Sequence, residues 1–238
     1  MHIGILQTGH MVDAARTETG DYDEMFVALL GQHGLTFTTW DIEASQFPTD
    51  AAAAEGWLIT GSRHGAYEDH PWIPPLEALI RDIVGSGRPI VGICFGHQII
   101  ATALGGRVEK FAGGWTVGPT QYRLDDGSTR TLNAWHQDQV LDLPDGARTF
   151  ATSDTCAIAG FTIGDTVLTW QPHPEYGTQA LGALMTHRGG AVDPDRLADA
   201  RTRLGGATDR QNVGAEIAAF LKAAQGRALP AAEAPDVA

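Results

Sequence analysis

The stretch VGICFGHQII, Val91–Ile100, contains the point at which a buried strand turns into a helix. Apolar Ile90–Ile93 predicts the strand, and Phe95–Leu104, which a Gly-Gly pair follows, predicts the helix. Short apolar strands and amphipathic helices alternate in the same way before this stretch. The strands are expected at Ile3–Gln7, Leu35–Trp40 and Trp57–Thr60, and the helices at Asp21–Gly31 and Pro75–Gly85. This alternation predicts an α/β protein with a parallel, doubly wound sheet covered by helices on both faces.

After Val108 the pattern changes to strand-like runs separated by turn residues, which indicates antiparallel or mixed pairing. These runs are Thr116–Leu124, Thr149–Thr152, Cys156–Ile163 and Val167–Gln171. Helices are expected again at Leu181–His187, Pro194–Leu204 and Val213–Leu221. From Gln225 the sequence is Ala/Pro-rich without periodicity, which predicts a disordered tail over 225–238. No repeat or linker divides the rest, so residues 1–224 are expected to form one domain.

The composition is that of an ordinary soluble globule, with 238 residues, 43% hydrophobic and 19% charged. The net charge is −13 and no basic run occurs, so nucleic acid and anionic membranes are poor candidate partners. No apolar stretch approaches the roughly 18 residues of a membrane helix, and the N terminus lacks the cationic region of a signal peptide. Two distant cysteines make no disulfide framework, and no paired Cys/His spacing indicates zinc. We therefore expect a cytoplasmic protein without a metal or cofactor.

Cys94 lies at the junction between strand and helix, with Gly92 and Gly96 two residues away on either side. G-x-C-x-G is the cysteine counterpart of the nucleophile elbow, a tight strand–turn–helix bend that projects a nucleophile. Glycine is needed at both positions because a Cβ there would collide with neighbouring backbone. The helix N terminus gathers partial positive charge, which favours a thiolate over a thiol. Cys94 is therefore a candidate nucleophile, the alternative being a buried structural cysteine.

His173 is the histidine best placed to act as a base, because it too follows an apolar strand, in TWQPHPEYG. Sites in parallel sheets collect beyond the carboxyl ends of the strands. Pro172 and Pro174 restrict the backbone on both sides of the histidine. Glu175 is close enough to hold one ring nitrogen and to stabilise an imidazolium. The alternative is a turn histidine with satisfied hydrogen bonds, but the elbow upstream favours a base.

GICFGHQ followed by QPHPE resembles the Cys-His-Glu signature of class I glutamine amidotransferases, the triad-type glutaminase domains. The likeness covers roughly residues 2–190. It implies the flavodoxin-like fold of that family, a mixed, mainly parallel sheet with helices on both faces, and makes residues 1–224 a glutaminase domain. By this resemblance Cys94 is the nucleophile, His173 the base and Glu175 the orienting carboxylate.

The resemblance also implies where the oxyanion of the reaction is held. The Phe95 N–H matches one donor of the oxyanion hole. The other donor comes in the family from a loop after the third strand, here ITGSR, Ile59–Arg63. Many members have Gly-Pro there, whereas this chain has Gly61-Ser62-Arg63. Gly61 and Ser62 are therefore the candidates for the second N–H.

Two further segments are implied to bind the substrate. Gln98, one helical turn after the cysteine, matches the family glutamine that binds the α-amino-acid end. The segment AWHQDQV, Ala134–Val140, resembles the family loop that contacts bound glutamine. Its candidate contact residues are His136, Gln137 and Asp138, the last for the substrate ammonium.

The fate of the released amine divides the functional hypotheses. The sequence has no G-x-x-x-x-G-K loop and no Gly-rich phosphate site, so no synthetase is expected within it. By the resemblance it hydrolyses the γ-amide of glutamine through a γ-glutamyl thioester, with an ammonia-accepting synthetase as a possible partner. The stretch Gly61–Glu77 resembles the stand-alone, guanylate-synthase-like branch, which keeps a γ-glutamyl peptide hydrolase as one alternative. A catalytically silent regulator that binds γ-glutamyl compounds is another.

The sequence does not assign a definite role to four aromatic or charged residues or to the second cysteine. Arg63 and Tyr67 are bulkier than the residues common in ammonia-channelling relatives, a hint of a leaving group larger than ammonia. Core packing is favoured for Trp135, and nothing decides between core and pocket for Trp115. Cys156 lies in an apolar run and is expected in the core.

Overall fold

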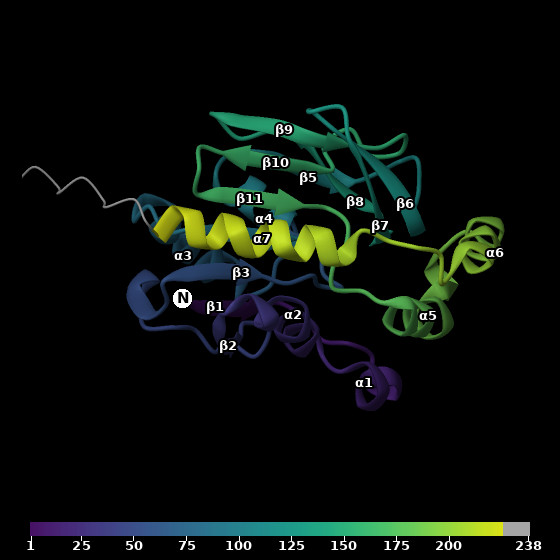
Figure 1. Ribbon diagram of the computed structural model, residues 1–238, viewed down its shortest axis with the longest axis horizontal. Coiled ribbons are helices and arrows are strands. Elements are labelled where there is room, and N and C mark those ends of the chain that lie inside the picture. Colours follow the sequence, from purple (N-terminus) through teal and green to yellow (C-terminus); the bar gives the residue numbers. More distant parts are fainter. Residues whose placement is uncertain (226–238) are drawn as a thin grey trace, which may run out of the picture.

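Residues 1–225, the part of the chain that the computed structural model describes, form a nine-stranded sheet with helices on both faces (Figure 1). Across the sheet the strands are β2 (Thr36–Asp41), β1 (His2–Gln7), β3 (Gly56–Ile59), β4 (Ile90–Ile93), β11 (Val167–Trp170), β10 (Gly160–Ile163), β9 (Ala147–Thr152), β6 (Thr116–Leu124) and β7 (Thr129–His136). Neighbours from β2 to β11 pair in parallel, and those from β11 to β7 pair antiparallel. The predicted doubly wound, mixed sheet is confirmed.

The helices lie on the two faces of this sheet and beyond its edge. They are α1 (Asp13–Thr19), α2 (Tyr22–Leu30), α3 (Ile73–Gly85), α4 (Phe95–Ala103), α5 (Thr178–His187), α6 (Pro194–Arg203) and α7 (Arg210–Gln225). Short 3-10 turns occupy Gly31–His33, Ala51–Ala53 and Gly189–Ala191. In Figure 1, α7 runs across the near face of the sheet, while α3 and α4 lie behind it. A separate antiparallel ribbon joins β5 (Arg107–Lys110) to β8 (Asp138–Asp142).

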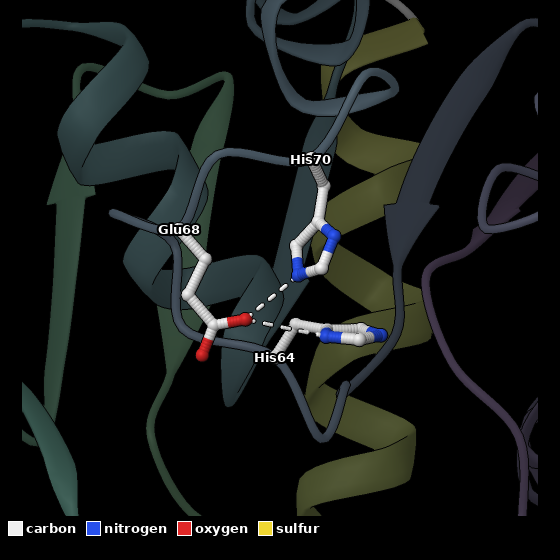
Figure 2. A group of neighbouring side chains, drawn as sticks. All are labelled: His64, Glu68 and His70. Carbon is white, nitrogen blue, oxygen red and sulfur yellow. Dashed lines mark hydrogen bonds and ion pairs between the residues drawn. The ribbon is translucent and has the colours of Figure 1, made fainter.

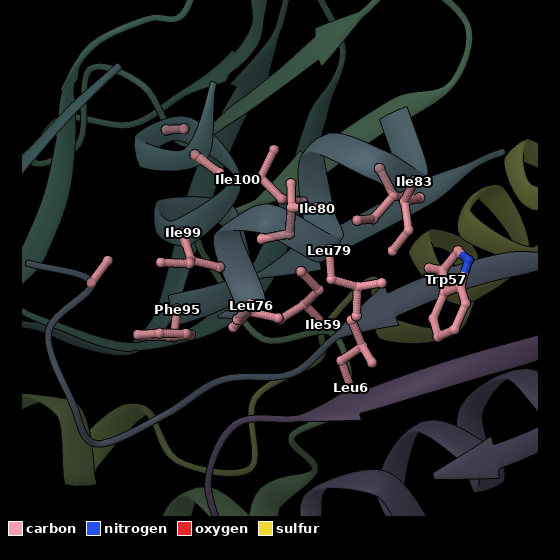
Figure 3. Packing of buried hydrophobic residues seen from close by; sticks show 14 of the residues in the cluster. Leu6, Trp57, Ile59, Leu76, Leu79, Ile80, Ile83, Phe95, Ile99 and Ile100 are labelled. Carbon is pink, nitrogen blue, oxygen red and sulfur yellow. The ribbon is translucent and has the colours of Figure 1, made fainter. Parts of the chain in front are cut away.

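A hydrophobic core lies between the sheet and the helices α3 and α4. Figure 3 shows the apolar side of α3, including Leu76, Ile80 and Ile83, packed with Ile99 of α4 against strand residues such as Ile59. All of these side chains are fully buried. Each contributes about 1.5–3 kcal/mol when it leaves water. The amphipathic spacing that predicts α3 therefore also fixes which of its faces meets the sheet.

The loop that follows β1 is held to α2 by the N-cap residue of that helix. Asp21 is the N-cap, and it forms a capping box with Glu24. The Asp21 carboxylate also accepts hydrogen bonds from the Met11 N–H at 2.8 Å and from His10 Nδ1 at 2.7 Å. Replacement of such a cap typically costs about 1 kcal/mol. The loop after β1 is thus fixed beside the carboxyl edge of the sheet.

Several elements differ from the sequence prediction. Helix α1 was not expected, because its sequence DAARTET buries only Ala15 and has no apolar face. Strands β5, β7 and β8 were not expected either. The predicted strand Cys156–Ile163 is a strand only from Gly160, since the Cys156 carbonyl accepts from the Ser153 N–H at 2.8 Å and closes a turn.

None of the described helices is long and apolar enough to cross a membrane. The predicted tail over 225–238 lies outside the described residues, except for Gln225, which ends α7.

Candidate active site

Cys94 stands in the sharp turn between β4 and α4, and its backbone is strained there. Its φ is 54° and its ψ is −102°, a conformation that costs a non-glycine residue about 1–3 kcal/mol. The Cys94 N–H donates to the Trp170 carbonyl at 2.8 Å, which ties the turn to β11. A Cβ on Gly92 would lie 2.4 Å from the Gly96 oxygen, and one on Gly96 would lie 2.4 Å from the Ile59 oxygen. The predicted need for glycine on both sides is confirmed.

His173 follows β11 at the same edge of the sheet, and its ring is held from several sides. Nδ1 lies 2.7 Å from Glu175 Oε1, and both side chains are almost fully buried. The backbone N–H donates to the Asn133 carbonyl at 2.9 Å. The Tyr176 ring stacks on the imidazole, with centroids 3.9 Å apart and planes at 6°. Position and tilt of the imidazole are therefore both fixed.

The backbone of this loop is fixed by side chains from distant elements. Arg210, the first residue of α7, donates from Nη2 to the Glu175 carbonyl at 3.0 Å and from Nε to the Pro174 carbonyl at 3.2 Å. Asn133 Nδ2 donates to the Tyr176 carbonyl at 2.8 Å. The turn after β11 is thus supported by α7 and β7 as well as by its prolines.

Cys94 and His173 border the same point next to Gly61. A Cβ on Gly61 would lie 2.9 Å from His173 Cε1 and 3.7 Å from Cys94 Cβ. Burial lowers the pKa of His173, but the charges of Glu175 and Cys94 and their hydrogen bonds to the ring raise it to about 10. Among the described residues Nε2 has no hydrogen-bond partner of regular geometry. The ring is therefore a cation at neutral pH, with Nε2 available to the thiol.

Backbone donors without an acceptor lie beside Cys94. The N–H groups of Cys94 and Gly96 donate to carbonyls at the ends of neighbouring strands. The Phe95 N–H, between them, has no acceptor within the described part of the chain, as expected for the first turn of a helix. The N–H groups of Gly61 and Ser62 are likewise without an acceptor there. These are the N–H groups that the sequence predicts for an oxyanion hole.

A cavity of about 470 Å³ opens over Cys94 and His173. The predicted residues that line it are Cys94, His173, Gln98, Ser62, His136, Gln137 and Asp138, together with the open candidates Arg63, Tyr67, Trp115 and Trp135. Glu175 lies behind His173 and is not one of the residues that line this cavity. The structure thus brings the predicted residues from five segments of the chain to one place.

Gln98 connects the elbow helix to the far wall of the cavity. Its Nε2 donates to the Asp138 carbonyl at 2.9 Å and to Gln171 Oε1 at 3.1 Å. The Asp138 carboxyl faces the cavity next to Tyr67. Burial raises the pKa of this carboxyl, while a hydrogen bond from the Tyr67 hydroxyl and the charge of Lys110 oppose the rise. The Asp138 carboxyl is therefore a partly buried hydrogen-bond acceptor in the cavity wall.

The segment Ala134–Val140 is not a loop, which corrects one expectation. β7 ends at His136 and β8 begins at Asp138, so only Gln137 lies between the strands. The segment is extended because β7 pairs with β6 and β8 with β5. Burial, together with the charge of His173, lowers the pKa of His136 to about 3. A neutral imidazole therefore stands next to the cationic one.

Several residues of the cavity wall were expected in the core, were left undecided or were not predicted. Trp135 is buried as expected, yet it also lines the cavity, and Trp115 packs on it with ring centroids 5.7 Å apart. Lys110 and Arg188 also line the cavity. Only Tyr176 carried a usable signal, since it directly follows the predicted His173–Glu175 pair. Cys156 is 1% exposed, as predicted for a core residue.

A second group of polar side chains lies at the rim of the cavity. His64, Glu68 and His70 offer one possible metal-ligand atom each, all within 4.8 Å of one another (Figure 2). His64 and Glu68 also belong to the cavity wall. This cluster was not predicted, because the spacing of its residues matches no common zinc pattern.

Comparisons with known proteins identify the family and the fold of this chain. The family model described as glutamine amidotransferase class-I matches residues 20–189. Gamma-glutamyl peptidase 4 of Arabidopsis thaliana is 33% identical over 183 residues, which cover 70% of this chain and 72% of the relative. A glutamine amidotransferase-like protein of Schizosaccharomyces pombe is 30% identical over 206 residues, 77% of this chain and 83% of its own. The solved glutamine amido transferase of Methylobacillus flagellatus shares the fold, with a TM-score of 0.74, 24% identity, and 94% and 93% of the two chains covered.

Proposed function

The chain belongs to the class I glutamine amidotransferase family, and we propose that it hydrolyses γ-glutamyl amide bonds through Cys94, His173 and Glu175. The observation that carries this proposal is the buried His173–Glu175 pair beside a strained cysteine in one cavity. In this assignment Cys94 is the nucleophile, His173 the acid and base, and Glu175 the carboxylate that orients the imidazole and stabilises its charge. We assign the activity to a single domain over residues 1–224.

In the proposed reaction, His173 moves protons between the leaving amine, the attacking water and its own ring. The Cys94 thiolate attacks the γ-carbonyl carbon, and the carbonyl π electrons move to oxygen. The N–H of Phe95 and one of the free N–H groups at Gly61 or Ser62 hold that oxyanion; one such donor is worth about 3 kcal/mol in acyl transfer. The C–N bond then breaks as imidazolium at His173 protonates the departing amine. A water gives a proton to the neutral imidazole and attacks the thioester, which releases glutamate and restores the ion pair.

The glutamyl half of the substrate meets the wall formed by Gln98 and Asp138. The substrate ammonium needs an anionic or carbonyl acceptor, and the Asp138 carboxylate faces the cavity. Gln98 fixes the Asp138 backbone from the elbow helix, so nucleophile and ammonium acceptor keep one relative position. His136, held neutral by its low pKa, leaves His173 as the one imidazolium of this pair.

The size and the charges of the cavity favour a γ-glutamyl peptide over glutamine as the substrate. A cavity of about 470 Å³ lies within the range of roughly 300–1,000 Å³ that holds drug-sized ligands, and glutamine is much smaller than those. Beside the carboxyls of Glu68 and Asp138, three cationic side chains line it, those of Arg63, Lys110 and Arg188. Such side chains suit the carboxylate of an amino acid or peptide that leaves. We therefore favour a stand-alone γ-glutamyl peptide hydrolase, the activity named for the Arabidopsis relative.

Glutaminase activity in the service of an ammonia-accepting synthetase is the second candidate, since amidotransferases as a class act in that way. A catalytically silent binder is disfavoured, because a silent protein gains nothing from the strain of about 1–3 kcal/mol at Cys94.

The test compares kcat/KM for glutamine and for a γ-glutamyl dipeptide on the purified chain, with glutamate release as the signal. A peptidase should prefer the dipeptide by about tenfold or more, which corresponds to about 1.4 kcal/mol of transition-state binding. Cys94→Ala, as the control, should remove both activities. A preference for glutamine, or activity that appears only with an added synthetase, would support the second candidate. Binding without turnover would leave the silent binder.

A further inference from the structure

The loop between β3 and α3 gathers three metal-ligand side chains around one oxygen atom. His64 Nδ1 lies 3.3 Å from Glu68 Oε2, and His70 Nε2 lies 2.7 Å from the same oxygen. Figure 2 shows both imidazole rings directed at one oxygen of the Glu68 carboxylate. Two imidazoles and one carboxylate on a common face are the donor set that transition metals such as zinc use with open positions left for other ligands.

The spacing of these atoms fits a metal ion of the size of zinc. Zinc bonds of about 2.0–2.2 Å in a tetrahedral arrangement place neighbouring donor atoms about 3.3 Å apart. The three donor atoms lie within 4.8 Å of one another, with contacts of 3.3 Å and 2.7 Å to the shared oxygen. Shifts of a few tenths of an ångström at the carboxylate would admit the ion. Neutral imidazoles present a lone pair to it once their ring protons occupy the opposite nitrogens.

His64 has the outer partner that orients metal-binding histidines. Its other nitrogen, Nε2, lies 3.1 Å from Glu43 Oε1. A carboxylate behind a ligating histidine fixes the tautomer and the direction of the ring. Arg63 Nε is also 3.3 Å from Nε2, but Arg63 already donates to the same Glu43 oxygen at 2.8 Å through Nη2. The carboxylate is thus the natural acceptor for both groups, which leaves His64 Nδ1 free for a metal.

Trp72 gives both rings a rigid support. The tryptophan is 4% exposed and belongs to the core beneath α3. His70 stacks on it with planes at 8° and centroids 5.6 Å apart, and His64 meets it edge-on at 5.8 Å. The His70 carbonyl also accepts from the Ile73 N–H at 3.0 Å at the start of α3. The ring positions therefore come from packing and not only from their bonds to Glu68.

The cluster is accessible and carries the right charge. The side chains of His64, Glu68 and His70 are 16%, 42% and 30% exposed, so an ion can reach them from water. Glu43 and Glu68 together carry two negative charges against the one positive charge of Arg63. A divalent cation would be compensated there rather than repelled.

We propose that His64, Glu68 and His70 bind a divalent transition-metal ion of the zinc type at the rim of the cavity. The site is separate from Cys94 and His173, and its existence does not depend on the reaction assigned to them. His64 and Glu68 also line the cavity that contains Cys94 and His173. Magnesium and calcium, which prefer all-oxygen ligands, are excluded by the two imidazoles.

The test is a Zn²⁺ titration of the purified full-length chain in a Cys94→Ser background, so that the thiol in the cavity cannot be the ligand. One ion per chain should bind with a Kd of about 10 µM or tighter, equivalent to about −7 kcal/mol. His70→Ala and Glu68→Gln should each weaken binding about tenfold or more. Glu43→Gln should weaken it about tenfold through the orientation of His64. His187→Ala, an exposed histidine at the end of α5, should leave it unchanged.

A second readout identifies the ligand atoms. Co²⁺ in the same background should show the visible d–d absorption of a nitrogen- and oxygen-ligated ion, and the His70→Ala variant should lose it. Circular dichroism of each variant checks that the fold persists. A Kd weaker than about 10 µM for the Cys94→Ser protein overturns the proposal. So does an affinity that His70→Ala leaves intact, or one that His187→Ala reduces as much.

Discussion

Glu175→Gln separates the charge of the orienting carboxylate from its shape. The carboxylate lies 2.7 Å from His173 Nδ1, with both side chains buried, and its charge is one of the causes that raise the pKa of the ring to about 10. A buried hydrogen bond to a charged group is worth about 1.5–3 kcal/mol. At about 1.36 kcal/mol per pKa unit, the pKa of His173 should fall by about 1–2 units. Where the ring carries its charge in the transition state, the same energy is lost there, and kcat should fall about 10–100-fold.

The assay pairs kinetics with a titration. Glutamate release from a γ-glutamyl dipeptide gives kcat, and the NMR shifts of the His173 ring, assigned through His173→Ala, give its pKa. Glu216→Gln, which changes a half-exposed carboxylate on α7 in the same way, should alter neither quantity. Cys94→Ala should abolish turnover. The reasoning is wrong if Glu175→Gln damages kcat as much as Cys94→Ala does, or if the pKa of His173 stays at about 10.

Three other predictions test the elbow, the thiols and the buried histidines. Gly96→Ala should destabilise the fold by about 3 kcal/mol or more, because its Cβ would lie 2.4 Å from a backbone oxygen; Gly85→Ala, with open space around it, should be neutral or stabilising in the same urea titration. A glutamine-mimicking electrophile should label Cys94 and not Cys156, whose pKa burial raises to about 12; equal labelling by mass spectrometry would contradict the assignment. Burial, with the charge of His136 adding to it, lowers the pKa of His97 from 6.5 to about 3, so its contribution to stability is present above pH 6.5 and is lost as the pH falls toward 3. His97→Gln should flatten that part of the stability–pH curve, and an unchanged slope would refute it.

The sheet and the residues around Cys94 could be predicted from sequence because both have local causes. The Gly92-x-Cys94-x-Gly96 spacing is a steric requirement, and the structure shows the backbone atoms that impose it. Helix α3 was predictable because its apolar residues repeat with the period of a helix. The partnership of His173 and Glu175 was predictable because two residues of separation in a proline-restricted turn leave few directions for the side chains.

The contacts that hold the cavity walls together could not be predicted, because they join distant segments. The Ala134–Val140 segment looked like a loop, but its strands form through pairing with β5 and β6, which periodicity alone does not reveal. Gln98 reaches Asp138 across 40 residues of sequence. The His64 cluster depends on Glu43 and Trp72, from before and after its loop. Such sites are properties of tertiary packing rather than of any motif.

The contact of Arg210 with the turn after β11 determines how short a fragment of this protein can be and still fold around its site. The match to the family model ends at residue 189. Arg210, beyond that point, donates to the carbonyls of Pro174 and Glu175, and α7 covers one face of the sheet. A gene fragment trimmed to the shared region would discard that support and expose the apolar surface beneath α7. A chimaera made from this protein therefore has to include α7. A boundary chosen from the family match alone would separate α7 from the sheet and from the turn after β11.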